Sequence, residues 1–188
     1  MLRICLLDKI SSQVICVANT HLKAKAGSRN DAIRDHQAKQ LLQDLQQAVT
    51  GLSVAESTAS ESDSAARQHE QRPPLVILCG DLNTTPDSTT CQLIRSHALA
   101  LGSSWDTYPG GNVISSAQSK QPFTTWKFRS SGESKRIIDY IWYSVDERLK
   151  LTAHWELLDE ESIGDDGLPT LMYPSDHLAV CCEFSISS

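Results

Sequence analysis

The sequence feature that most constrains the fold is the apolar run LVILC at residues 75–79, which is followed at once by polar residues. The run has the length and the aliphatic, β-branched composition of a buried strand, and Gly80 and Pro86 mark its end. Asp81 and Asn83 are two residues apart, so they would point to the same side of an extended backbone. The segment therefore predicts a strand that delivers a carboxylate and a carboxamide to one place. The alternative is an ordinary Asx-type turn, which the same two residues also favour.

Length and composition indicate an ordinary globular domain. The chain has 188 residues, 40% hydrophobic and 21% charged, which is the size of one domain spanning residues 1–188. A formal net charge of −6 argues against a surface that grips a long polyanion, whereas a small phosphorylated ligand in a local basic pocket is compatible with it. The six cysteines include no C-x-x-C pair, which favours reduced thiols over a zinc site. We expect no membrane insertion, because no run approaches roughly 18 apolar residues.

Hydrophobic periodicity predicts a mixed α/β domain in which antiparallel pairs are prominent. The run at 137–143 is expected to pair with the one at 124–128, with Gly132 in the turn between them. A Ser- and Ala-rich stretch at 53–72 is expected to be a disordered surface loop. The other expected strands lie at 2–7, 14–18, 149–158 and 177–184, and the expected helices lie at 30–49, ending at Gly51, and at 88–101.

Polar clusters follow or interrupt strong strand sequence at four places. They are the segments 19–23, 80–83, 138–140 and 173–177. Asp139 lies inside an apolar strand, and an unpaired buried carboxylate costs several kcal/mol, so it implies a partner. Taken singly, each of the other clusters can be a turn or a surface histidine.

Metal-assisted phosphoester hydrolysis is a chemistry that uses all four clusters. It needs an oriented water, positive charge near the phosphoryl oxygens, and a proton or metal at the leaving oxygen. Asp81 is the candidate for activating or positioning the water, with Asn83 holding it or a phosphate oxygen. His177, held in orientation by Asp139, is the candidate for acting on the phosphoryl group. His21 is expected to donate to another phosphate oxygen.

The motifs T-H-L-K, G-D-x-N-x-x-P, I-D-Y-I-W-Y-S and P-S-D-H-L resemble those of the endonuclease/exonuclease/phosphatase superfamily in order and spacing. The resemblance implies an α/β fold, a four-layer α/β sandwich, and a magnesium-dependent phosphoesterase, with manganese as the alternative metal. It places His21, Asp81, Asn83, Asp139 and His177 at catalytic positions, Lys23, Lys25 and Arg129 at substrate-binding positions, and Asp176 near a second metal.

Within the superfamily, the chain is similar to members that remove the 2′-phosphate of NADP(H) to give NAD(H). The implied partner is NADP(H) or another phosphorylated nucleotide, in a monomeric protein of the cytoplasm or, alternatively, of mitochondria. Two alternatives stay open: a poly(A)-specific 3′ exoribonuclease acting on RNA, and a metal-deficient nucleotide-binding relic without activity.

Two departures from the superfamily pattern matter. Its principal metal ligand is a glutamate on an earlier strand, and no residue of this sequence can be assigned to that role, so we expect a domain incomplete at the N-terminus. We also expect the isolated chain to be poorly stable, because an unpaired sheet edge and half a core are costly. The second departure is Lys25, where the most similar members carry Arg, a better bidentate partner for phosphate.

Overall fold

The computed structural model describes residues 1–59, 72–107 and 122–187, and within them a central five-stranded sheet of order β1-β2-β3-β7-β4. Strands β2 and β3 are parallel, and the other neighbours in this sheet are antiparallel. The β5-β6 hairpin and a second two-stranded sheet, β8-β9, lie outside it. The elements are β1 (Leu2–Leu7), β2 (Val14–His21), α1 (Ser28–Ala59), β3 (Leu75–Asp81), α2 (Thr89–Arg95), β4 (Leu101–Ser103), the 3-10 helix η1 (Ser104–Thr107), β5 (Thr125–Arg129), β6 (Gly132–Arg136), β7 (Asp139–Ser144), β8 (Leu149–His154), α3 (Glu160–Ile163) and β9 (Cys182–Ile186).

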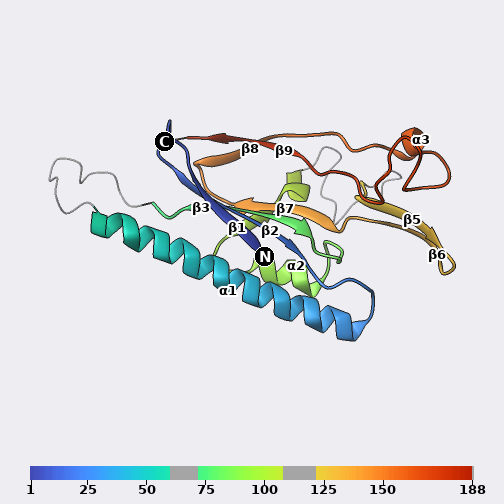
Figure 1. Cartoon of the computed structure of the whole chain (residues 1–188), viewed down its shortest axis with the longest axis horizontal. Helices are drawn as coiled ribbons and strands as arrows, with labels where there is room; N and C mark the ends of the chain where they lie inside the picture. The colour runs from blue at the N-terminus through green and yellow to red at the C-terminus, as the bar shows by residue number, and fades with distance from the viewer. Residues whose placement is uncertain (60–71, 108–121, 188) are drawn as a thin grey trace.

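The sheet separates two hydrophobic clusters, which makes three layers (Figure 1). Helices α1 and α2 cover one face, and the two-stranded β8-β9 sheet covers the other (Figure 1). Of the four layers expected for the sandwich, the described residues form these three, and the mixed α/β class is confirmed.

The side chains of strand β3 alternate between the two faces of the sheet. Val76 and Leu78 pack in the cluster on the helical side, while Leu75 and Ile77 belong to the cluster beneath β8 and β9. Because side chains alternate along a strand, Asp81 continues the row of Leu75 and Ile77. The carboxylate therefore emerges on the face opposite the helices.

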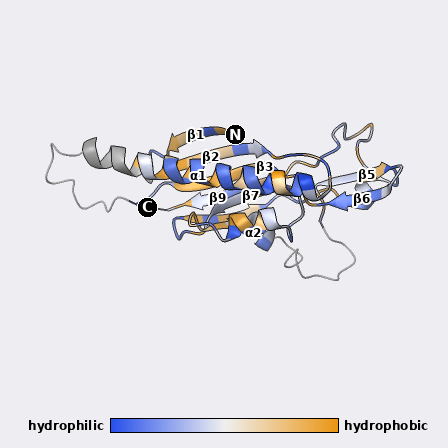
Figure 2. Cartoon of the chain, turned by 90° about the horizontal axis from the view of Figure 1, so that it is seen from below, coloured by the Kyte–Doolittle hydropathy of each residue, from blue (hydrophilic) through white to orange (hydrophobic). Residues whose placement is uncertain are grey.

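Helix α1 packs on the sheet through one apolar stripe, as the sequence predicted. Polar and apolar residues alternate along its ribbon (Figure 2). The predicted end at Gly51 was wrong, since α1 continues to Ala59. Gly51 is exposed and has open space where a Cβ would lie, so it costs the helix only about 1 kcal/mol and does not stop it. Part of the expected loop is thus helical backbone, and its remainder, 60–71, lies outside the described residues. None of the described helices is long and apolar enough to cross a membrane.

The predicted pairing of 124–128 with 137–143 was wrong. Strand β5 turns back after Arg129 and pairs with β6, where Gly132 takes φ +109°, a backbone conformation that favours glycine. Strand β7 instead enters the central sheet between β3 and β4. The polar sequence of 133–136 hid β6, whereas the apolar sequence of β7 suits a strand buried inside a sheet.

The last strand was also placed too early. Strand β9 begins at Cys182, because the preceding residues belong to a different packing unit. Leu178 is buried in a third cluster with Phe123, Trp126 and Leu168, and its N–H donates to the carbonyl of Thr124. This contact ties the 174–177 segment to β5.

Strand β1 is the exposed edge of the sheet. All six of its residues are exposed, and Leu2 keeps 72% of its surface accessible. Such an edge offers unpaired backbone groups and an apolar side to solvent. The low stability expected of the isolated chain stays a prediction, and this strand is the physical reason for it.

Arg148 joins three segments of the chain that are distant in the sequence or in separate loops. Its guanidinium donates to both carboxylate oxygens of Asp146 at 2.8 and 2.6 Å, to the side chain of Gln13 at 2.7 Å, and to the carbonyl of Pro73 at 3.1 Å. Arg148 is buried, and it lowers the pKa of Asp146 to about 2. Because the folded-state pKa is depressed, this pair contributes stability above the unfolded pKa of 3.8, and the contribution is lost as the pH falls through about 2.

Replacing Arg148 should therefore destabilise the protein at neutral pH. We expect Arg148→Met to lower the free energy of unfolding by about 2 kcal/mol at pH 7, because it leaves Asp146 and the Pro73 carbonyl without their charged donor. Lys150→Met, at an exposed position two residues away, is the matched control and should change it by less than about 0.5 kcal/mol. Urea unfolding measures both, and equal effects of the two variants would contradict the role given to Arg148.

Candidate active site

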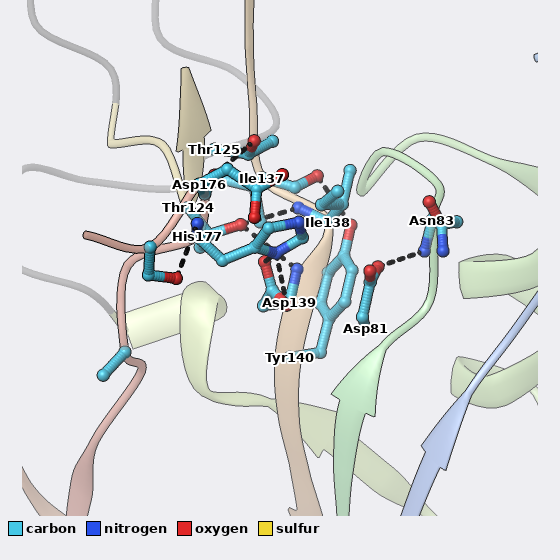
Figure 3. Close-up of polar contacts among 12 residues, drawn as sticks. Asp81, Asn83, Thr124, Thr125, Ile137, Ile138, Asp139, Tyr140, Asp176 and His177 are labelled. Atoms are coloured by element: carbon cyan, nitrogen blue, oxygen red, sulfur yellow. Dashed lines mark hydrogen bonds and ion pairs between the residues drawn. The ribbon is translucent and has the colours of Figure 1, made fainter. Parts of the chain in front are cut away.

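Two carboxylates face each other across neighbouring strands of the central sheet. Asp81 ends β3 and Asp139 begins β7, and the antiparallel register pairs these two residues directly. His177 reaches the same place from the segment before β9 (Figure 3). Asp81, Asp139 and His177 each offer a ligand atom, and these atoms all lie within 4.8 Å of one another. The structure thus brings together three of the five predicted catalytic residues in one group.

Gly80 sets the position of the first carboxylate. It has φ +145°, and a Cβ built on it would lie 1.9 Å from the carbonyl oxygen of Thr20 on the neighbouring strand. Any side chain here would force β2 and β3 apart. The close approach also pairs His21 with Asp81 in the parallel register. Glycine at this position is therefore a requirement of the site.

Asp139 orients His177 and is itself fixed through its backbone. Its carboxylate oxygens lie 2.9 and 3.1 Å from Nδ1 of His177. Because an ionised carboxylate can only accept hydrogen bonds, we assign an N–H to Nδ1 as the donor. The indole N–H of Trp105 donates to the Asp139 carbonyl at 2.9 Å, and the Asp139 N–H donates to the hydroxyl of Thr124 at 3.2 Å. Burial raises the pKa of Asp139, against the opposing effects of Thr124 and His177. The partner that the sequence required for this carboxylate is His177.

Asp81 uses its two oxygens differently. Oδ1 accepts the backbone N–H of Asn83 at 2.7 Å, and Oδ2 lies 3.3 Å from Nε2 of His21. Asn83 has φ +51°, and its side-chain NH₂ donates to the carbonyl of Leu22 at 3.1 Å. The Asx-type turn is thus real, and the extended geometry expected for the pair was wrong. The turn is therefore part of the site, because its hydrogen bond fixes the position of the Asp81 carboxylate.

Lys127 is a residue of the site that the sequence reasoning missed. Its ammonium lies 2.6 Å from Oδ2 of Asp176 and 3.4 Å from Nε2 of His177. Thr125, on the same face of β5, donates its hydroxyl to the Asp176 carbonyl at 2.9 Å. The alternation of Thr125 and Lys127 with the buried Trp126 was the available signal. The contacts of Lys127 and Thr125 hold the 174–177 segment against β5. The Lys127 ammonium lowers the pKa of Asp176.

The predicted substrate-binding lysines sit on a loop that a second missed residue holds. Lys23 and Lys25 are exposed, and one nitrogen of Arg34, on α1, donates to the carbonyl of Lys23 at 2.7 Å and to that of Lys25 at 2.9 Å. Arg34 is only 3% exposed and also pairs with Asp31. Lys25 has φ +77°, so the backbone is not extended at this residue. Arg129 is exposed at the end of β5.

The three-residue group suits a divalent cation. Carboxylate oxygens are ligands for Mg²⁺ and Mn²⁺, and imidazole extends the range to transition metals. Asp176 lies outside this group, because its carboxylate is paired with Lys127, so a metal role for it stays a prediction. On the β1 side, Asp81 also borders a pocket of about 360 Å³, whose other lining residues are Met1, Leu2, Asn19, Thr20 and His21.

Comparisons with known proteins identify the family to which the chain belongs. Residues 28–177 match the model of the Endonuclease/Exonuclease/phosphatase family. Nocturnin of Rattus norvegicus is 37% identical over 180 residues, 95% of this chain and 35% of that protein. The exoribonuclease subunit Ccr4 of the Coccidioides immitis CCR4-Not complex is 34% identical over 130 residues, 60% of this chain and 16% of that protein.

Among solved structures, the human Nocturnin catalytic domain with a bound sulfate anion superposes with a TM-score of 0.62 at 29% identity. The match covers 97% of this chain and 51% of that domain. The chain thus spans about a third of the length of the rat relative and about half of the solved human domain. On its sequence and its fold, the chain belongs to the endonuclease/exonuclease/phosphatase family.

Proposed function

We propose that the protein is a magnesium-dependent phosphoesterase that removes the 2′-phosphate of NADP(H), giving NAD(H). The observation that carries the proposal is the pair formed by His177 and Asp139 directly opposite Asp81. This arrangement supplies a general acid or hydrogen-bond donor and a water-positioning carboxylate on two sides of one small space. The 37% identity to rat Nocturnin supports the assignment to this branch of the family.

The side chains have complementary roles toward a phosphoester. Asp81 has lone pairs left after its bonds to Asn83 and His21, so it can accept a proton from the attacking water. With Nδ1 bound to Asp139, His177 presents Nε2 to the phosphoryl group, and a protonated ring donates there. Lys127, beside that nitrogen, adds positive charge where negative charge develops.

The metal would be held through the carboxylates of Asp81 and Asp139 together with the substrate phosphate, which is the ligand pattern that Mg²⁺ favours, and Mn²⁺ suits the same set. When bound, it polarises the phosphoryl oxygens and lowers the pKa of a bound water.

The substrate proposal rests on charge and size. Lys23 and Lys25, on the loop held by Arg34, and Arg129 on the hairpin are the exposed cations assigned to the substrate phosphates. A net charge of −6 favours a dinucleotide over a long RNA. The competing function, 3′ exoribonuclease activity on poly(A), is favoured by the match to the Ccr4 subunit. We propose a monomer in the cytoplasm, or alternatively in mitochondria.

Phosphate release from NADPH separates these functions and tests the pair formed by His177 and Asp139. Phosphate release from NADPH in the presence of Mg²⁺ should fall about 10²- to 10⁴-fold in His177→Gln, because the positioned proton donor is lost. His36→Gln, at an exposed position on α1, is the matched control and should retain full activity.

Three results would contradict the proposal. Rapid adenylate release from poly(A) with NADPH inert would identify the exoribonuclease. Binding of NADPH without metal-dependent phosphate release would identify a binding module. Unchanged phosphate release by His177→Gln would remove that histidine from the chemistry.

Lys127 is expected to support catalysis through its positive charge and its ion pair with Asp176. We expect Lys127→Met to lower kcat about tenfold, since the positive charge beside the phosphoryl group and the ion pair with Asp176 are lost, while Lys127→Arg restores most of it. KM for NADPH should change less than kcat, because the substrate phosphates are assigned to other cations. Lys150→Met serves as the control, and a Lys127→Met variant with wild-type kcat would show that the contact has no catalytic consequence.

A further inference from the structure

Two cysteines face each other at the exposed edge of the sheet, away from the groups used above. Cys5 on β1 and Cys16 on β2 are paired in the antiparallel register, and their Sγ atoms lie 3.4 Å apart. Cys5 is exposed, whereas Cys16 is buried. The pair therefore combines a thiol that dissolved reagents can reach with a second thiol already in contact with it.

The geometry allows a covalent bond between the two sulfurs. Directly opposed residues of antiparallel strands have Cα atoms about 4.5 to 5.5 Å apart, which is within the range of disulfides. Their Cβ atoms lie about 4.5 to 5.5 Å apart, whereas a disulfide prefers about 3.8 Å, so the strands must draw together locally. A bridge that forms with such an adjustment is more easily reduced than an unstrained structural disulfide.

We propose that Cys5 and Cys16 are a reversible disulfide site, in which Cys5 reacts first with a low-molecular-weight disulfide and Cys16 resolves the product. The Cys5 thiolate attacks glutathione disulfide, forming a mixed disulfide and releasing one glutathione thiolate. The Cys16 sulfur then attacks Sγ of Cys5, breaks the bond to glutathione, and releases the second glutathione thiolate. Two protein thiols are oxidised, one glutathione disulfide is reduced to two thiols, and the thiol protons pass to the released thiolates.

Burial and the neighbouring Cys5 raise the pKa of Cys16 to about 11, which makes it a poor first nucleophile. Once Cys5 is bound to glutathione, its thiol no longer raises the pKa of Cys16. Cys16 is therefore a better nucleophile at the step in which it attacks than it is in the free dithiol. The product ties the exposed β1 to β2, the strand that ends at His21.

The test is oxidation of the whole 188-residue chain in glutathione buffers of increasing oxidised fraction, read by non-reducing peptide mapping and mass spectrometry. The unsubstituted chain should yield a peptide linking Cys5 to Cys16, lighter than the two separate peptides by two hydrogen atoms and carrying no glutathione. Cys16→Ser should stop at the mixed disulfide on Cys5. Cys181→Ser, which removes another exposed thiol, should leave the linkage unchanged.

Dithiothreitol should break the linkage in the unsubstituted chain without denaturant, and thermal unfolding should show a higher Tm for the oxidised form than for the reduced form. Glutathione persisting on Cys5 in the unsubstituted chain to the same extent as in Cys16→Ser would overturn the proposal. So would a linkage that forms only after the chain is unfolded in urea.

Discussion

The site depends on a juxtaposition that a sheet would ordinarily avoid: two carboxylates paired directly across neighbouring strands. Asp81 raises the pKa of Asp139 through like-charge repulsion, in addition to the larger effect of burial. The structure offsets this cost with a histidine on each side, His21 at Asp81 and His177 at Asp139. A divalent cation bound between the carboxylates would offset it further. The arrangement is unfavourable for stability alone, and the proposed phosphoester chemistry gives a reason for it.

The surrounding scaffold fixes this pair with backbone contacts. Gly80 lets β2 and β3 approach closely enough to align the carboxyl ends of both strands. Trp105 and Thr124 hold the Asp139 backbone from two sides, and Thr124 also accepts the N–H of Ile138. Both side chains are buried, so the start of β7 cannot shift without breaking packed contacts. Catalytic geometry of this kind needs positioning groups that are themselves immobile.

Sequence reasoning recovered the elements whose periodicity was strong and the residues whose spacing was local. The β3 strand and the packing stripe of α1 follow from alternation and a helical repeat, and the motifs singled out Asp81 and Asp139. The direct pairing of these two residues was not predicted, because 137–143 was expected to pair with 124–128. The β5-β6 pairing failed because β6 is polar and half-exposed, so its partner is set by the turn at Gly132 and not by hydrophobicity.

Lys127 and Arg34 were missed for a different reason. Each acts on a segment distant in the sequence, 174–177 in one case and 23–25 in the other, and only the fold brings them there. The alternation along β5 indicates the side of the strand on which Lys127 lies, but a single sequence contains no signal for its distant partner. For Arg34, the available signal was a charged residue in line with the apolar stripe of α1, where an arginine is buried only when it is paired.

Metal binding by the chain tests the central claim most directly. Titration with Mn²⁺, followed by loss of the free-ion signal in electron paramagnetic resonance, should show one site in the unsubstituted chain. In Asp81→Asn, affinity at that site should fall about tenfold or more, because one of the two charged oxygen ligands is lost. His36→Gln should bind as the unsubstituted chain does. Binding that is absent from all three proteins, or equal in all three, would contradict the account of Asp81, Asp139 and His177 as a cation-binding catalytic group.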